Sequence, residues 1–210
     1  MFALMADLTD RLVVVVGGGP VGRRKARRLL ESGAIVRLVC LEPRPADFAF
    51  TRLVWLCEPY QADHLAGATL VFAAATPEVN RRVAADARRR GILVNRADDP
   101  ALGDFVVPAM HREGDLILAV STGGAAPTLA KRIRDRLADQ IDPALGEWVA
   151  LLRELRPQIA ERFPDPVRRR QMYERLAEIR WLEALHSQGP AAVRQAMWEE
   201  VRREADPPLK

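Results

Sequence analysis

The sequence predicts an α/β fold: a Rossmann-like, doubly wound parallel sheet, followed by a small strand-containing region and a C-terminal helical domain. Three observations carry this prediction. Apolar, β-branched runs alternate with amphipathic helical segments between residues 11 and 96, as in a parallel sheet with crossover helices. A G-x-G-x-x-G spacing follows the first apolar run. From about residue 142 onward only amphipathic helical segments remain.

The first element is an apolar run of one Leu and four Val residues at 12–16, which is typical of a strand buried on both faces. It ends at Gly17, and Gly19 and Gly22 complete the dinucleotide-binding spacing. The first glycine permits a tight turn, the second lets the backbone approach a pyrophosphate, and the third lets the next helix pack close to the strand. Pro20 suits the first turn of that helix, where its missing N–H costs nothing.

An amphipathic helix follows and ends near Ser32, and a second apolar run occupies residues 35–41. Together these elements form a βαβ unit whose helix N-terminus attracts an anion, so we expect a bound dinucleotide. The alternative is a glycine turn that serves packing alone. Glu42 follows the second run, where an acid bonds ribose hydroxyls and repels a 2′-phosphate, so the sequence favours NAD over NADP as cofactor.

The alternation continues with strands expected at residues 52–57 and 68–75. The latter ends in small residues that leave room for a cofactor, and Thr76 is placed to cap a helix at 77–90. A strand at 92–95 then leads to Asp98 and Asp99 at the edge where open α/β sheets bind ligands. These acids form either a chemically active pair or an ordinary Asp-Asp-Pro turn.

The periodicity changes after residue 103. Two strands are expected at 104–110 and 115–121, joined by a short turn that contains glycine. The segment Ser121-Thr122-Gly123-Gly124 precedes a helix with Leu129, Ala130, Ile133 and Leu137 at helical spacing, and it is either an anion cradle or an N-cap. Helices at about 144–163, 166–185 and 190–204 and a frayed end at 206–208 complete the chain.

Composition narrows the classes of protein. The 210 residues contain no apolar run near the roughly 18 residues that span a bilayer, and the first ten residues lack the basic segment of a signal peptide, so we expect a cytoplasmic protein without membrane association. The net charge is +4, but the arginines alternate with acids along helices, so we expect no nucleic-acid partner. Cys40 and Cys57 lack neighbours at zinc-ligand spacing, and we expect no metal site.

Five ordered blocks resemble the siroheme-synthase amino-terminal family. They are VGGGPVGRRKA (16–26), AAATPEVN (73–80), GILVNRADDP (91–100), DFVVPA (104–109) and AVSTGGAAPTLA (119–130). Members of this family are precorrin-2 dehydrogenases, and some are also sirohydrochlorin ferrochelatases. The resemblance therefore implies NAD-dependent oxidation of the tetrapyrrole precorrin-2 to sirohydrochlorin. It also implies insertion of Fe²⁺ or Co²⁺ where chelatase activity is present, and a homodimer built through the middle strands and the helical tail.

The same resemblance implies roles for particular residues. Pro20, Val21, Leu41 and Glu42 match NAD-contacting positions, which adds them to the glycines and Thr76. Asp98 matches a general base in oxidation and proton acceptor in chelation, and Ser121 and Thr122 match a hydroxyl-bearing segment beside the macrocycle. We therefore assign Asp98 and Ser121 to catalysis.

Two expectations follow from the chemistry of this site. Burial and the neighbouring Asp99 should raise the pKa of Asp98 and make it a better base. The substrate carboxylates need cationic partners, for which the candidates are Arg96, Arg112, Lys131, Arg132 and Arg134. The substrate set that we assign comprises Asp99, Arg112, Thr122, Gly123 and Lys131.

We expect an NAD-binding domain at 1–103, a dimerisation and active-site region at 104–142, and a helical domain at 143–210. Two other functions remain open: a non-catalytic NAD-sensing module whose basic helical tail docks onto nucleic acid or another protein, and a chelatase without dehydrogenase activity. The Asp98-Asp99 pair and the segment at 121–124 favour an enzyme, because a sensor would not need them.

Overall fold

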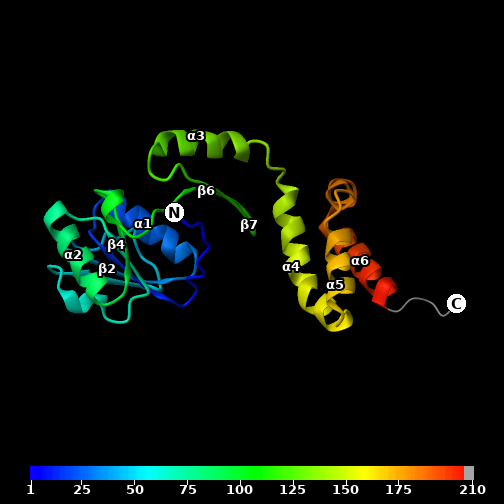
Figure 1. Ribbon diagram of the computed structural model, residues 1–210, viewed down its shortest axis with the longest axis horizontal. Helices are drawn as coiled ribbons and strands as arrows, with labels where there is room; N and C mark the ends of the chain where they lie inside the picture. The colour runs from blue at the N-terminus through cyan, green and yellow to red at the C-terminus, as the bar shows by residue number, and fades with distance from the viewer. Residues whose placement is uncertain (206–210) are drawn as a thin grey trace. The chain divides into compact units, whose positions relative to one another are not determined.

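The computed structural model describes residues 1–205, so the frayed end expected at 206–208 lies outside the described residues (Figure 1). Contacts divide the chain into two compact units. The first comprises Met1–Val107 and Gly123–Ala125, and the second contains Pro108–Thr122 and the residues from Ala126 onward. The division into three domains stays a prediction.

The first unit is the predicted Rossmann-like fold. Its five parallel strands lie in the order β3-β2-β1-β4-β5. The strands are β1 (Leu12–Val16), β2 (Ile35–Cys40), β3 (Leu53–Cys57), β4 (Leu70–Ala73) and β5 (Leu93–Arg96). The helical elements are α1 (Pro20–Glu31), the short 3₁₀ turns η1 (Ala62–Leu65) and η2 (Pro100–Leu102), and α2 (Pro77–Arg89).

The side chains of the central strand β1 are buried on both faces of the sheet. Because side chains alternate along a strand, Val13 and Val15 pack with residues of α1, whereas Val14 and Val16 pack with residues of α2. All four valines are at most 2% exposed. The carboxyl ends of the strands therefore emerge together between two helical layers, at the edge where the predicted site residues follow each strand.

The expected strand at 104–110 is wrong in its first half. The chain at Asp104 runs beside β5 without forming a strand: the Asp104 amide donates to the Val94 carbonyl, and the Asp104 carboxylate accepts from the Val94 amide. The Asp104 carboxylate thus accepts the hydrogen bond that a backbone carbonyl would accept in a regular β-ladder. Strand pairing resumes only after Pro108, which has no N–H to donate.

In the second unit a hairpin of β6 (Ala109–Glu113) and β7 (Leu116–Val120) packs with α3 (Pro127–Ala138). The hairpin turn is Gly114-Asp115, and Gly114 has a φ of +55°. Three further helices follow: α4 (Ala144–Arg162), α5 (Pro166–Leu176) and α6 (Arg180–Ala205). Their core contains Trp148, Leu151, Leu155, Leu176 and Trp181, all of which are buried.

The helix expected at 166–185 is two helices. The carbonyls at the end of α5 are satisfied by indole groups, because Trp148 Nε1 donates to the Leu176 carbonyl and Trp181 Nε1 donates to the Arg175 carbonyl. The break expected before residue 190 is a kink inside α6, where Gly189 has non-helical angles and Pro190 follows. No helix within residues 1–205 is long and apolar enough to cross a membrane.

Candidate active site

The glycine turn after β1 has the close packing that its spacing predicts. Gly17 has a φ of +115°, and a Cβ there would lie 2.3 Å from the Ala74 carbonyl oxygen. A Cβ at Gly22 would lie 1.9 Å from the carbonyl oxygen of Gly17. Any larger residue at either position would push β1, α1 and the end of β4 apart.

The middle of the turn is open instead. A Cβ at Gly19 would meet nothing within 4 Å, and Val21 is 38% exposed. Gly19 is the N-cap of α1, Pro20 is the first helical residue, and neither a side-chain cap nor an acid occupies this first turn. Free N–H groups and the positive end of the helix dipole therefore face open space, so this turn fits the pyrophosphate of a dinucleotide.

Glu42 lies over the same turn, as its predicted ribose contact requires. A Cβ at Gly18 would lie 3.1 Å from the Glu42 carboxylate. The backbone here is held by side chains to which the sequence analysis gave no role. Cys40 Sγ and Trp55 Nε1 donate to the Glu42 carbonyl, and Cys57 Sγ donates to the carbonyl of Leu41. The Leu41 side chain remains 70% exposed.

The end of β4 is organised by a residue that the sequence analysis missed. Thr76 caps α2 as predicted, with its hydroxyl accepting from the Val79 amide. Asn80, which is fully buried, accepts from the Ala75 amide and donates to the Ala75 carbonyl. The Asn80 side chain also helps to lower the pKa of Asp98. A polar residue on the inward face of an amphipathic helix was the available signal.

Asp98 follows β5 at the same sheet edge. The Ala97 amide donates to the Ala73 carbonyl at 2.9 Å, and Ala74 in turn abuts Gly17. One strand, β4, therefore lies between Asp98 and the glycine turn.

The expectation of a raised Asp98 pKa is wrong. Arg96 donates from Nη2 and Nε to the two oxygens of the Asp98 carboxylate, at 2.6 and 3.2 Å. These hydrogen bonds outweigh burial and hold the pKa of Asp98 below its usual value of 3.8. The Asp98 side chain is 22% exposed, so a carboxylate held in the ionised form remains accessible.

Arg96 is also misassigned as a candidate substrate clamp. It is 6% exposed and committed to Asp98. Asp99 caps η2, because its carboxylate accepts from the Ala101 amide at 3.1 Å. This bond is the structural role that an Asp-Asp-Pro turn predicts, and a substrate role for Asp99 stays a prediction.

A second missed group lies beneath the sheet edge. Lys25 of α1 donates to Asn95 Oδ1 at 2.9 Å, and Asn95 Nδ2 donates to the Phe105 carbonyl. The Lys25 ammonium also lies 5.0 Å from the centre of the Phe72 ring. Burial, reinforced by Arg24 and Arg28, lowers the pKa of Lys25 to about 8. Lys25 precedes the buried Leu29 by one helical turn, and this spacing could have indicated that Lys25 faces the interior.

Three of the remaining assigned residues, Ser121, Thr122 and Gly123, come directly before α3 in the chain. Thr122 Oγ1 accepts from the Ala126 amide at 3.0 Å, which favours a capping role for this hydroxyl. Gly123 has a φ of +64°, and a Cβ there would meet nothing within 4 Å, so the turn after Ser121 is open.

The predicted substrate cations differ in how free they are. Arg112 on β6 and Lys131 on α3 are exposed. Arg134 is committed to the carbonyl of Met110, which ties α3 to β6. Among residues 1–205, no three His, Cys, Asp or Glu side chains gather in a way that could hold a metal ion.

The fold and the glycine turn define a Rossmann dinucleotide-binding protein, and the comparisons agree. Residues 4–109 match a family described as putative NAD(P)-binding, which supports a nicotinamide dinucleotide as cofactor. Residues 113–140 match the central region of sirohaem biosynthesis proteins, and residues 144–204 match the sirohaem synthase dimerisation region. The chain belongs to the siroheme synthase amino-terminal family.

Individual relatives are consistent with this family. A siroheme synthase of Nitrosospira multiformis is 34% identical over 99% of this chain and 46% of its own length. One from Chromobacterium violaceum is 37% identical over 95% of this chain and 43% of its own. The chain thus spans less than half the length of these relatives. The solved structure of SirC, described as a precorrin-2 dehydrogenase, has the same fold, with a TM-score of 0.73, 23% identity and coverage of 97% of this chain and 100% of that one.

Proposed function

We propose that this chain is an NAD-dependent dehydrogenase that oxidises precorrin-2 to sirohydrochlorin. The observation that carries the proposal is the adjacency of the glycine turn and an ionised, accessible Asp98, through Ala73 and Ala74, at one edge of the sheet. Family membership and the fold shared with a precorrin-2 dehydrogenase support the choice of substrate.

The chain positions the cofactor with backbone and one carboxylate. The N–H groups at the start of α1 bind the pyrophosphate, and Glu42 accepts hydrogen bonds from the adenosine ribose, which favours NAD over NADP. When bound, the nicotinamide supplies the hydride acceptor.

A low pKa suits the task of Asp98 in this reaction. A tetrapyrrole that has lost a hydride is positively charged, and its ring N–H protons are therefore strongly acidic. A carboxylate kept ionised by Arg96 stabilises this positive charge and then accepts the proton, although it is a weak base. Arg112 and Lys131 remain our candidates for binding the substrate carboxylates, with Ser121, Thr122 and Gly123 beside the macrocycle.

We also propose that the enzyme is a homodimer, which the match of residues 144–204 to a dimerisation region supports. We also propose that the enzyme acts in the cytoplasm, which its similarity to siroheme synthases supports. Where chelatase activity accompanies oxidation, Fe²⁺ or Co²⁺ is a substrate and Asp98 accepts the protons that the macrocycle releases.

An anaerobic assay of precorrin-2 with NAD tests the proposal. NADH formation and the spectrum of sirohydrochlorin are followed for the wild type, for Asp98→Ala and for Asp63→Ala. Asp63 is a control on η1 whose side chain is 95% exposed and paired only with Arg90. We expect Asp98→Ala to abolish turnover while its NAD affinity stays within a few-fold of the wild-type value. Asp63→Ala should behave as wild type.

Three outcomes would count against this assignment. Unchanged turnover in Asp98→Ala would reject the role of Asp98. NADH binding by the wild type without turnover would favour the sensing module. Metal insertion by a wild type that binds precorrin-2 and NAD but forms no NADH would favour a chelatase without dehydrogenase activity.

A further inference from the structure

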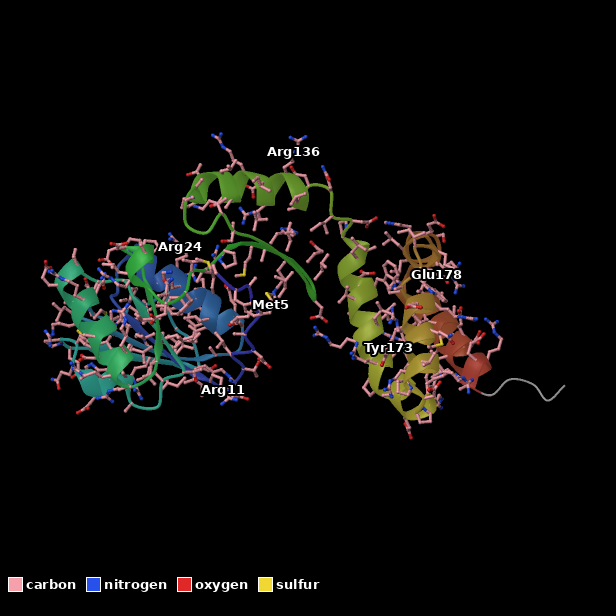
Figure 2. All side chains as sticks on the ribbon, viewed as in Figure 1. Met5, Arg11, Arg24, Arg136, Tyr173 and Glu178 are labelled. Atoms are coloured by element: carbon pink, nitrogen blue, oxygen red, sulfur yellow. The ribbon has the colours of Figure 1, made fainter. Side chains whose placement is uncertain are left out.

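The outer face of α1 forms one wall of a groove of about 640 Å³. Four arginines, Arg23, Arg24, Arg27 and Arg28, line it, and the loop that contains Pro45, Asp47 and Phe48 forms the opposite wall. Figure 2 labels Arg24, which belongs to the exposed face of this helix. None of these arginines has a part in the proposed reaction.

The four arginines of α1 have no acidic partner among residues 1–205. Their one specific contact is that of Arg27 with the ring of Phe48, and Glu31 and Asp47, which also line the groove, form no ion pair with them. The other crossover helix is the opposite case. On α2 and its C-cap, Arg81, Arg88, Arg89 and Arg90 each pair with a carboxylate.

This arrangement is unfavourable for the isolated helix. Arg23 and Arg27, like Arg24 and Arg28, are like charges four residues apart, and such pairs destabilise a helix. Arg23 and Arg24 also lie in the N-terminal half of α1, where the helix dipole favours acids. The positive charges of Arg24 and Arg28 also act on the inner side of the helix, because both lower the pKa of Lys25.

We propose that this groove binds a small molecule with several oxyanion groups, either phosphates or carboxylates. The paired arginines are separated by one helical turn, about 6 Å along the axis, so a ligand with two or more anionic groups can engage both pairs. Guanidinium groups bind such groups with two parallel hydrogen bonds. The volume lies within the usual range for small-molecule sites.

The groove adjoins the dinucleotide turn at Pro20 but extends away from it along α1 to Glu31. Asp98 does not line it and follows β5, which β4 separates from β1. The inference goes beyond the proposed dehydrogenase and does not depend on it.

The test measures binding of two probes by calorimetry, at constant ionic strength and with NAD at saturation. Inorganic tripolyphosphate represents a phosphorylated ligand, and mellitate, a benzene hexacarboxylate, represents a polycarboxylate. The variant is Arg24→Gln/Arg28→Gln, and the matched control is Arg81→Gln/Arg82→Gln on α2. We expect the first variant to weaken binding at least tenfold and the control to change it less than twofold. Arg24→Lys/Arg28→Lys should restore part of the affinity.

A second readout locates the ligand. An anion beside Arg24 and Arg28 offsets their field, so the pKa of Lys25 should rise when a probe binds, as NMR of labelled lysine side chains would show. Tighter binding of tripolyphosphate identifies a phosphorylated ligand, and tighter binding of mellitate identifies a polycarboxylate. The proposal is overturned if neither probe binds, if both double Gln variants lose binding equally, or if binding leaves Lys25 unchanged.

Discussion

Arg96 and Asp98 show how one buried side chain alters the chemistry of its neighbour. In sequence, the two acids after β5 suggest mutual repulsion and a raised pKa. In the structure, Arg96 turns back to Asp98, while the Asp99 carboxylate is used to cap η2. The pair therefore provides a fixed negative charge, which suits a reaction that develops positive charge on its substrate.

Replacing Arg96 tests this interpretation. In Arg96→Met the pKa of Asp98 should rise toward its usual value, because the hydrogen bonds that Arg96 donates to the ionised form are lost. NMR titration of carboxyl groups, with Asp98→Asn for assignment, would show the shift, and Arg82→Met serves as an exposed control. In the wild type, the Arg96–Asp98 pair stabilises the fold fully above a pH of about 4, the pKa of Asp98 in the unfolded chain. This stabilisation is lost as the pH falls through the lower pKa of Asp98 in the folded protein. The free energy of unfolding of Arg96→Met should not show this decrease. An unshifted Asp98 titration would contradict this interpretation.

Gly19 and Gly22 separate ligand binding from packing. In Gly19→Ala the new Cβ meets nothing within 4 Å, and the φ of −67° is ordinary for alanine, so the free energy of unfolding should change by less than about 0.5 kcal/mol. NAD affinity should still fall at least tenfold, because the methyl group occupies the space of the pyrophosphate.

In Gly22→Ala the Cβ would lie 1.9 Å from the Gly17 carbonyl oxygen, so α1 must move. We expect destabilisation by about 1–3 kcal/mol together with loss of NAD binding. Chemical denaturation measures the free energy of unfolding of both variants, and NAD titration measures their cofactor affinity. Equal stability of the two variants would contradict the packing role assigned to the third glycine.

At the scale of elements, helix α1 carries positively charged side chains with different roles on its outer and inner sides. Its outer face carries the unpaired arginines, and its inner side carries Lys25, which joins the helix to β5 and to the chain at Phe105 through Asn95. The helix that begins at the dinucleotide turn is thus fastened to the strand that precedes Asp98. A polar network of this kind fixes the spacing of the two elements more tightly than apolar contacts alone.

Lys25 should make stability depend on pH in the alkaline range. Its pKa is about 8 in the folded protein and about 10.4 when unfolded. Between these values the unfolded chain binds more protons, so the free energy of unfolding should rise with pH, whereas below pH 8 this contribution is constant. Lys25→Met should lack the rise.

The sequence contains three lysines, so NMR of labelled lysine side chains resolves this group directly. We expect a signal that titrates near pH 8 in the wild type and is absent from Lys25→Met. Titration of every lysine above pH 10 would rule out the buried network as described.

At the scale of the whole molecule, the proposed homodimer needs an apolar surface. Leu129, Ile133 and Leu137 lie on one face of α3 and are 51%, 39% and 40% exposed. Helical spacing therefore predicted a shared face, but none of residues 1–205 covers these three side chains fully.

We expect Leu129→Glu/Ile133→Glu to shift the protein from dimer to monomer, because two charges would have to be buried in the interface. Arg132→Glu on the same helix is the control and should stay dimeric. Sedimentation velocity measures both variants. A dimer of undiminished stability in the double variant would exclude this face from the interface.

The sequence alone determined the Rossmann-like unit and the position of its dinucleotide turn, because both depend on local patterns: β-branched runs, helical spacing, and glycines whose separation reflects backbone geometry. Only the tertiary structure decided the state of Asp98, the commitment of Arg96, the network of Lys25 and the course of the chain at Asp104. Each of these depends on which side chain lies beside which across strands and loops. Protonation and pairing follow from that three-dimensional proximity, which no local pattern specifies.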